Sequence, residues 1–243
     1  MTFQVAMIGS DGWVLASDRQ TINAEHEERT TTSGPKIEYY PDYDLVFCSA
    51  GDRLGRFAAN LLVDEISKLA AARDDPDDML RAIGNRVFDV LSHRDAWTQT
   101  RQLIVALPSR GKKLHQLSLL RTLEPIWSVT GGDHRGQGFG MSVVTKHDGK
   151  VFGGDPSAGR LLSQIFYERL PVADLKKLAA FSVLLGHEIN PAAVAGLDIF
   201  VATEARTGLL EPEELGDLEA EFPRVKNKLK SAVFGKRPSR KAR

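Results

Sequence analysis

The sequence has very little cysteine and no long apolar run. Its 243 residues include one cysteine, Cys48, which lies in the apolar run 45–48. One cysteine excludes an internal disulfide, and its setting favours a buried thiol. No stretch approaches the roughly 18 apolar residues of a membrane span, and the N-terminus lacks the features of a secretory signal. We therefore expect a cytoplasmic protein without a membrane partner.

The net charge of the chain is zero, but the charged residues are unevenly distributed along it. Lys and Arg number 32, as do Asp and Glu. Residues 222–243 contain nine bases and no acid, so residues 1–221 carry a net charge of −9. We expect a globular domain over 1–221 and a partly disordered basic tail over 222–243. A solvated tail and a tail docked on an acidic neighbouring subunit both fit, whereas Phe234 alone gives little support for stacking on nucleic-acid bases.

No pattern of a metal or cofactor site is present. His134 and His147 have no His, Cys or acidic residue at a metal-ligand spacing. The glycine-rich stretch 131–140 lacks the GxxxxGK[ST] pattern of a phosphate-binding loop. We therefore expect no metal and no cofactor.

Apolar spacing predicts strands interrupted by two pairs of helices. Period-two and continuous apolar runs predict strands over 3–9, 13–17, 36–40, 45–49, 102–107, 114–120, 141–145 and 197–203. Apolar residues on one face predict helices over 53–72, 79–92 and 172–186. We also expect helices over 160–169 and over the acidic stretch 211–221. The polar stretch 21–35 is interpreted as a loop. This order predicts an α+β fold with two sheets, each covered by helices.

The first two strands form a hairpin that starts almost at the chain's beginning. Asp11 and Gly12 provide a strong turn signal between them. Removal of Met1 would leave Thr2 with a hydroxyl and a free α-amine, which together make a nucleophile and its own base. The amine's ordinary pKa of about 7.7–8.0 suits that role. Many chains begin Met-Thr without consequence, so an ordinary N-terminus is the alternative.

Four stretches, in order, make the chain resemble bacterial relatives of the proteasome β-subunits, which are N-terminal nucleophile hydrolases. They are Thr2 before the hairpin, Asp11-Gly12 followed by 14–18, Lys36-Ile37 opening a strand, and 49–52 running into a helix. Residues 153–157 and 196–201 match more weakly. The resemblance implies a four-layer αββα sandwich of two antiparallel sheets flanked by helices.

The resemblance also implies a site. Thr2 would be the nucleophile, Lys36 would favour the neutral amine, Asp18 would orient Lys36, and the backbone N–H of Gly51 would face the oxyanion. The implied function is a threonine-type endopeptidase or amidohydrolase acting on peptides or unfolded proteins in a self-compartmentalising homo-oligomer, a ring or a spiral, with an ATPase partner left open. Each of these residues, taken singly, also has an ordinary structural interpretation. Asp18 could simply end a strand, Lys36 could be an exposed lysine at the start of a strand, and Gly51 could only form a turn.

The chain departs from the family pattern at three supporting positions. Gln20 stands where the family often has arginine, Gly153-Gly154-Asp155 replaces Gly-Ser-Gly, and an Asp-x-x-Ser motif falls on Asn190 and Ala193. Asp155 or Ser157 is a candidate substitute for the missing serine. These departures keep a second hypothesis open, a catalytically weak or inactive proteasome-like assembly subunit.

Overall fold

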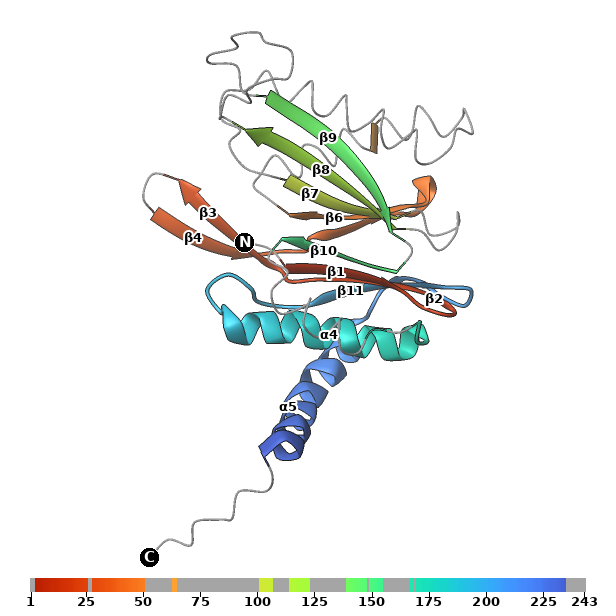
Figure 1. The fold of residues 1–243 in the computed structure, drawn as a ribbon, viewed down its shortest axis with the longest axis vertical. Helices are drawn as coiled ribbons and strands as arrows, with labels where there is room; N and C mark the ends of the chain where they lie inside the picture. The colour runs from red at the N-terminus through yellow and green to blue at the C-terminus, as the bar shows by residue number, and fades with distance from the viewer. Residues whose placement is uncertain are drawn as a thin grey trace, which may run out of the picture.

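The fold consists of antiparallel sheets with helices packed outside the first of them (Figure 1). The computed structural model describes residues 3–25, 28–50, 63–64, 101–106, 114–122, 139–147, 149–154, 167 and 169–234. Within these ranges, no helix is long and apolar enough to cross a membrane.

The first sheet is built around the predicted N-terminal hairpin. Its strand order is β10-β1-β2-β11-β12, with β1 at Phe3–Ile8, β2 at Gly12–Ser17, β10 at Lys150–Gly154, β11 at Asp198–Thr203 and β12 at Thr207–Leu209. Every residue of β1 and β2 is buried. Both faces of this sheet are covered, which explains why apolar residues fill most positions of the two strands rather than alternating with polar ones.

The second sheet is an antiparallel meander that confirms the expected second layer of strands. Its order is β5-β6-β7-β8-β9, with β5 at Ile37–Tyr40, β6 at Leu45–Ala50, β7 at Arg101–Ala106, β8 at Leu114–Thr122 and β9 at Phe139–His147. A 3₁₀ turn, η1 at Pro41–Tyr43, joins β5 to β6. The two antiparallel sheets of the predicted fold are therefore both present.

One hydrophobic core lies between the two sheets. It includes Ala6, Ile8, Trp13 and Leu15 from the first sheet and Ile37, Val46, Cys48 and Leu114 from the second. The ring of Phe200 stacks on Trp13 at 5.4 Å and meets the edge of Tyr39 at 4.9 Å, so aromatic contacts join the sheets.

A second core lies between the first sheet and α4, which spans Val172–Ile189. Leu175, Ala179 and Val183 recur at a spacing of four and face Phe3, Val5 and Met7 of β1 within this core. Helix and strand thus bury complementary apolar faces against one another.

Helix α4 is fastened to the hairpin turn at its N-terminal end. The Val172 amide donates to Asp11 Oδ1 at 2.8 Å, which caps the helix from the turn. The Ser10 amide donates to the Leu170 carbonyl at 3.1 Å, and the Tyr167 hydroxyl donates to the Ile8 carbonyl at 2.7 Å. The start of the helix and the hairpin turn therefore form one hydrogen-bonded unit.

Helix α5 is longer than predicted. It spans Pro212–Phe234, beyond the predicted end at Glu221 and through Pro223. Leu218 and Phe222 are buried, and the Phe222 ring meets Phe181 of α4 at 5.0 Å. Two acids in its first turn, Glu213 and Glu214, interact favourably with the helix dipole. Figure 1 shows the second half of α5 running away from the sheets.

The loop predicted over 21–35 is wrong. Strands β3 (Gln20–Glu25) and β4 (Glu28–Ser33) pair antiparallel as a separate two-stranded ribbon, from Gln20 opposite Ser33 to Glu25 opposite Glu28. The stretch is polar but contains four threonines and an isoleucine, whose branched Cβ favours extended backbone. Polarity alone misled the prediction, because threonine is both polar and β-branched.

The helical layers are only partly within the described residues. The predicted helix over 172–186 is confirmed as α4. Of the predicted helix over 53–72, only Val63 and Asp64 are described, and both are helical. Helix 79–92 lies outside the described residues, as does most of 160–169. The fourth layer of the αββα sandwich, a set of helices outside the second sheet, therefore stays a prediction.

Candidate active site

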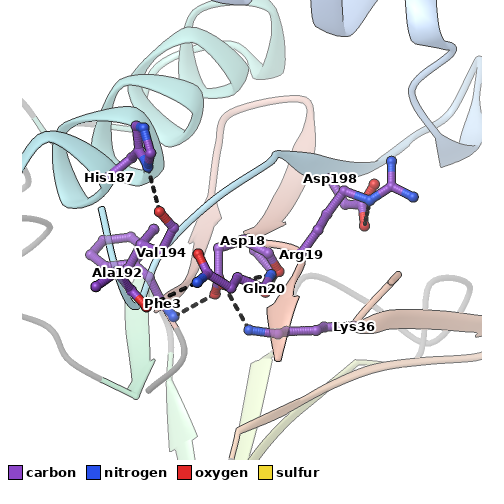
Figure 2. A network of polar contacts seen from close by, with 10 residues as sticks. Phe3, Asp18, Arg19, Gln20, Lys36, His187, Ala192, Val194 and Asp198 are labelled. Atoms are coloured by element: carbon purple, nitrogen blue, oxygen red, sulfur yellow. Dashed lines mark hydrogen bonds and ion pairs between the residues drawn. The ribbon is translucent and has the colours of Figure 1, made fainter. Parts of the chain in front are cut away.

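Asp18 lies where β2 turns into the ribbon, and it joins three parts of the chain. Its carboxylate Oδ1 accepts the Phe3 amide at 2.7 Å, and Oδ2 accepts the Gln20 amide at 3.0 Å. Oδ2 also accepts Lys36 Nζ at 2.7 Å (Figure 2). The Asp18 side chain is 0% exposed. The chain's first described residue, the end of the hairpin and Lys36 are thus held together by one buried carboxylate.

Lys36 lies just before β5, where the ribbon leads into the second sheet. Its side chain is 8% exposed, so its ammonium group is nearly as buried as its partner. Burial raises the pKa of the Asp18 carboxyl, and the charge and hydrogen bond of Lys36 oppose that rise, together with the amides of Phe3 and Gln20. Each charge therefore compensates the burial of the other.

The expected Asp18–Lys36 pair is present, whereas the other two predicted site residues lie outside the described residues. Thr2 directly precedes Phe3 in the sequence, and Gly51 directly follows β6. Strand β6 pairs with β5 so that Cys48 is opposite Ile37. Asp155 and Ser157 also lie outside the described residues. The roles assigned to all of these residues remain predictions.

The segment that follows α4 packs directly on the Asp18 region. The Gln20 Nε2 group donates to the Ala192 carbonyl at 2.9 Å, and the Arg19 amide donates to the Ala195 carbonyl at 2.8 Å. Figure 2 shows Arg19, Gln20 and Ala192 gathered around Asp18. Gln20 replaces the expected arginine, and the structure shows that it links two segments 172 residues apart in the chain.

His187 and Asn190 help to shape the same segment. His187 Nδ1 lies 2.5 Å from the Val194 carbonyl oxygen, and the Asn190 amide donates to the Gly186 carbonyl at 2.9 Å. Gly196 has a φ of +74°, a left-handed backbone conformation that favours glycine. An added Cβ there would lie 2.9 Å from Arg19 Cβ. The turn can therefore approach Arg19 only because residue 196 lacks a side chain.

Three polar residues form a row across the first sheet beside the Asp18–Lys36 pair. Gln4 of β1 and Asp198 of β11 both lie directly opposite Ser17 of β2. Asp198 is also 3.7 Å from the Arg19 side chain, and burial raises the pKa of its carboxyl, opposed by the Arg19 charge. We call Gln4, Ser17 and Asp198 the polar row.

Gln4 was not singled out from the sequence, although a signal was available. It is the only polar residue in the otherwise apolar strand Phe3–Ile8. It is 0% exposed, and neither atom of its carboxamide has a hydrogen-bond partner in the part of the chain that the structure describes. A buried carboxamide without partners is unusual and calls for an explanation.

The described residues do not gather a metal site. Within them, no three His, Cys, Asp or Glu residues lie close enough together to hold a metal ion.

Solved structures share this fold along the whole chain. The Anbu (Gly-1) mutant from Hyphomicrobium sp. strain MC1 matches with a TM-score of 0.67 and 15% identity, covering 100% of both chains. Anbu (ancestral beta-subunit) from Yersinia bercovieri matches with a TM-score of 0.64 and 16% identity, covering 99% of this chain and 100% of the other. The helical assembly of the Anbu complex from Pseudomonas aeruginosa gives 0.62 and 16%, with the same coverage.

These likenesses establish the fold. No protein-family model matches the sequence, and no curated protein matches it. The chain shares the α+β fold of these Anbu structures, one of which is described as an ancestral beta-subunit.

Proposed function

We propose that this chain is a threonine-type peptidase or amidohydrolase that uses Thr2 as its nucleophile after Met1 is removed. The observation that carries the proposal is the buried Asp18–Lys36 pair at 2.7 Å, which also holds the Phe3 amide at 2.7 Å. Because Phe3 is bonded to Thr2, the pair lies one peptide bond away from the proposed nucleophile.

The proposed reaction proceeds through an ester. The Thr2 hydroxyl oxygen attacks the carbonyl carbon of a peptide bond, and the α-amine of Thr2 takes the hydroxyl proton. The C–N bond of the substrate then breaks, and the amine returns that proton to the leaving nitrogen. Water attacks the resulting ester, which releases the acyl product and restores the hydroxyl.

The charged pair supports the amine as a base. A lysine ammonium beside an α-amine lowers the pKa of that amine, because two like charges disfavour each other. A neutral amine at physiological pH can then accept the hydroxyl proton. Asp18 orients Lys36 through their hydrogen bond at 2.7 Å. The backbone N–H of Gly51 is the proposed donor to the oxyanion, an interaction worth roughly 3–4 kcal/mol in other acyl-transfer enzymes.

We also propose that the chain works as a homo-oligomer. The Pseudomonas aeruginosa structure of the same fold is a helical assembly of the Anbu complex. A ring or spiral that encloses the site would restrict access to peptides and unfolded proteins.

One observation favours a second candidate, a weakly active or inactive assembly subunit. Ala193 is buried at the position where the family's motif has serine, so this side chain offers no hydroxyl to the site. Asn190 likewise stands where the motif has a carboxylate.

Intact mass and a covalent probe test the proposal. We expect purified protein to lack Met1, and an epoxyketone, which reacts with the hydroxyl and amine of an N-terminal threonine, to add one probe per chain. Thr2→Ala and Lys36→Ala should lose labelling. Lys177→Ala is the matched control, because Lys177 is an exposed lysine on α4.

The outcomes separate the two candidates. Labelling of Thr2→Ala would identify another nucleophile, and retained Met1 would exclude the mechanism. Chains that lack Met1, are correctly folded and remain unlabelled would favour the inactive assembly subunit.

A further inference from the structure

Arg19 is a second cation beside Asp18, but it is bound elsewhere. It follows Asp18 directly in the chain, and its Nε atom lies 3.7 Å from Oδ2 of Asp198. Asp198 is the first residue of β11 and lies opposite Ser17, the residue before Asp18. Figure 2 shows the Arg19 side chain directed toward Asp198 and the Lys36 side chain directed toward Asp18. Two neighbouring ion pairs therefore keep the two cations apart.

An unbound Arg19 guanidinium would compete for the Asp18 carboxylate. The two oxygens of a carboxylate offer about four acceptor positions, and three donors contact those of Asp18. A further donor can therefore be accepted. A guanidinium presents paired N–H groups that match a carboxylate better than the single ammonium group of a lysine does. A released Arg19 would therefore displace Lys36 or share its position.

The fold directs the Arg19 side chain toward Asp198. The Cβ, Cγ and Cδ atoms of Arg19 lie 2.9, 3.1 and 3.1 Å from the point where a Cβ at Gly196 would be, so this stem packs on the bare backbone of the glycine. The Arg19 amide also donates to the Ala195 carbonyl at 2.8 Å. Asp198, two residues after Gly196, receives the charged end. Residues 195–198 therefore hold Arg19 by its backbone and by its side chain.

Stability alone does not explain a carboxylate at residue 198. Its Oδ2 atom and the Arg19 Nε atom are both buried, and neither has a hydrogen-bond partner in the part of the chain that the structure describes. A buried ion pair with incomplete hydrogen bonds stabilises a fold little, and well-packed apolar residues of similar volume can often replace it. The charge of Asp198 is therefore better explained by what it does to Arg19 than by its contribution to folding.

We propose that Asp198 is a positioning residue of the candidate active site, because it holds Arg19 away from Asp18. Lys36 thereby keeps its contact with the Asp18 carboxylate. The effects of the two cations are divided in the same way. Lys36 opposes the rise that burial causes in the pKa of Asp18, and Arg19 opposes the corresponding rise in the pKa of Asp198. The importance of this division for catalysis rests on the proposed function, in which Lys36 acts beside the N-terminal amine.

The effect of Lys36→Met in three backgrounds tests this role without requiring turnover. Urea denaturation gives the shift in midpoint that Lys36→Met causes in wild type, in Asp198→Asn and in Asp198→Asn/Arg19→Gln. In Asp198→Asn we expect about half of the wild-type shift, because the released Arg19 supplies a substitute counter-ion and the two changes are then not additive. Removal of Arg19 as well should restore the full shift. A role of Asp198 in folding alone would leave the shift the same in every background.

A matched control and a second measurement complete the test. Asp174→Asn should leave the Lys36→Met shift unchanged, because Asp174 is an exposed acid on α4. A crystal structure of Asp198→Asn, which does not depend on the stability of Lys36→Met, should show the Arg19 guanidinium within hydrogen-bond distance of the Asp18 carboxylate.

The outcomes separate this inference from the proposed function. Equal midpoint shifts in all three backgrounds would overturn the inference, as would an Arg19 side chain that still lies against residue 198 in Asp198→Asn. The expected shifts in a chain that no epoxyketone labels would support the inference while contradicting the proposed function.

Discussion

Asp18 has the greatest number of distinct partners among the site residues described. Its two oxygens receive the Phe3 amide, the Gln20 amide and Lys36 Nζ, all within 3.0 Å. Its backbone amide also donates to the Phe3 carbonyl at 3.1 Å. This one residue therefore fixes both the path of the chain's first strand and the position of the buried Lys36 ammonium group.

Replacing Lys36 by methionine should destabilise the protein in a pH-dependent way. Asp18 would be left as a buried carboxylate without its counter-ion, and such changes cost about 3–5 kcal/mol. The pKa of Asp18, already raised by burial, would rise further. Stability should then fall as the pH rises from about 4, the unfolded value, through the folded pKa, because the folded state holds a proton that the unfolded state loses.

Urea denaturation of Lys36→Met at pH 5 and pH 8 measures this effect. The double variant Asp18→Asn/Lys36→Met is the control, since a neutral amide removes the titrating group. Equal stability of Lys36→Met at the two pH values would contradict the prediction.

Cys48 should be unreactive in the folded protein. It is 0% exposed, and burial raises the pKa of its thiol to about 12. At pH 8 the thiolate, which is the reactive form, is almost absent from the folded state. Ellman's reagent should therefore react with the single cysteine only after denaturant is added. Rapid reaction of one thiol per chain in native buffer would contradict this.

The raised pKa of the Cys48 thiol should also make the folded protein less stable at alkaline pH. The unfolded thiol loses its proton near pH 8.5, whereas the folded thiol keeps it to about pH 12. Between these values, stability should fall as the pH rises, and Cys48→Ala should show a shallower fall in thermal melts from pH 8 to pH 10.

Among individual residues, the sequence predicted the charged pair better than the buried amides. Asp18 and Lys36 belong to short stretches that resemble a known family, and their expected contact is present at 2.7 Å. Gln4 and Gln20 depend on distant partners. Gln4 is understood only once β10 places Gly153 opposite it, and Gln20 bonds a carbonyl 172 residues away. No local sequence pattern encodes contacts between residues so far apart in the chain.

At the scale of elements, the N-terminal hairpin packs against β11 more closely than most strands allow. A Cβ at Gly12 would lie 2.0 Å from the Ala202 carbonyl oxygen. That oxygen belongs to the backbone of β11, so no flexible side chain can move aside. Glycine at residue 12 is therefore required by the sheet as well as by the turn.

Gly12→Ala should destabilise the protein by about 2–4 kcal/mol, because the strand must shift away from β11. Gly216→Ala is the matched control with the opposite sign. Gly216 lies within α5 with nothing within 4 Å of an added Cβ. Alanine in that helical position should stabilise the protein by about 0.5–1 kcal/mol. Thermal melts of both variants compare the effects, and a neutral Gly12→Ala would contradict the close contact.

The elements predicted correctly are those that bury apolar faces. The hairpin, α4 and the strands 45–49, 102–107 and 114–120 combine apolar residues with clear periodicity, and the structure contains each of them. The ribbon β3–β4 was missed because threonine is both polar and β-branched. The second half of α5 was missed because Pro223 and a run of bases follow the buried Phe222.

At the scale of the whole molecule, backbone amides should be best protected from hydrogen exchange in the strands that contribute to both hydrophobic cores. Strands β1 and β2 lie between both cores, whereas the ribbon β3–β4 forms a sheet of its own. A two-stranded ribbon is marginally stable by itself. Native-state hydrogen exchange should therefore be slowest in β1 and β2 and fastest in 20–25 and 28–33. Equal protection of the ribbon and β1 would indicate that the ribbon is covered in solution, for example by another subunit.

Helix α4 also determines how the molecule would bear a mechanical load. Its start is bonded to the hairpin turn through Asp11 and Ser10. Beyond its end, residues 192 and 195 are bonded to Gln20 and Arg19. A force that pulls on the C-terminus is transmitted through α5 and β11 to α4. Hydrogen bonds hold the start of α4 to the hairpin turn and the segment after α4 to residues 19 and 20, just beyond the hairpin. The Asp18 region should therefore resist such tension as one block with α4, and yield in a single step rather than strand by strand.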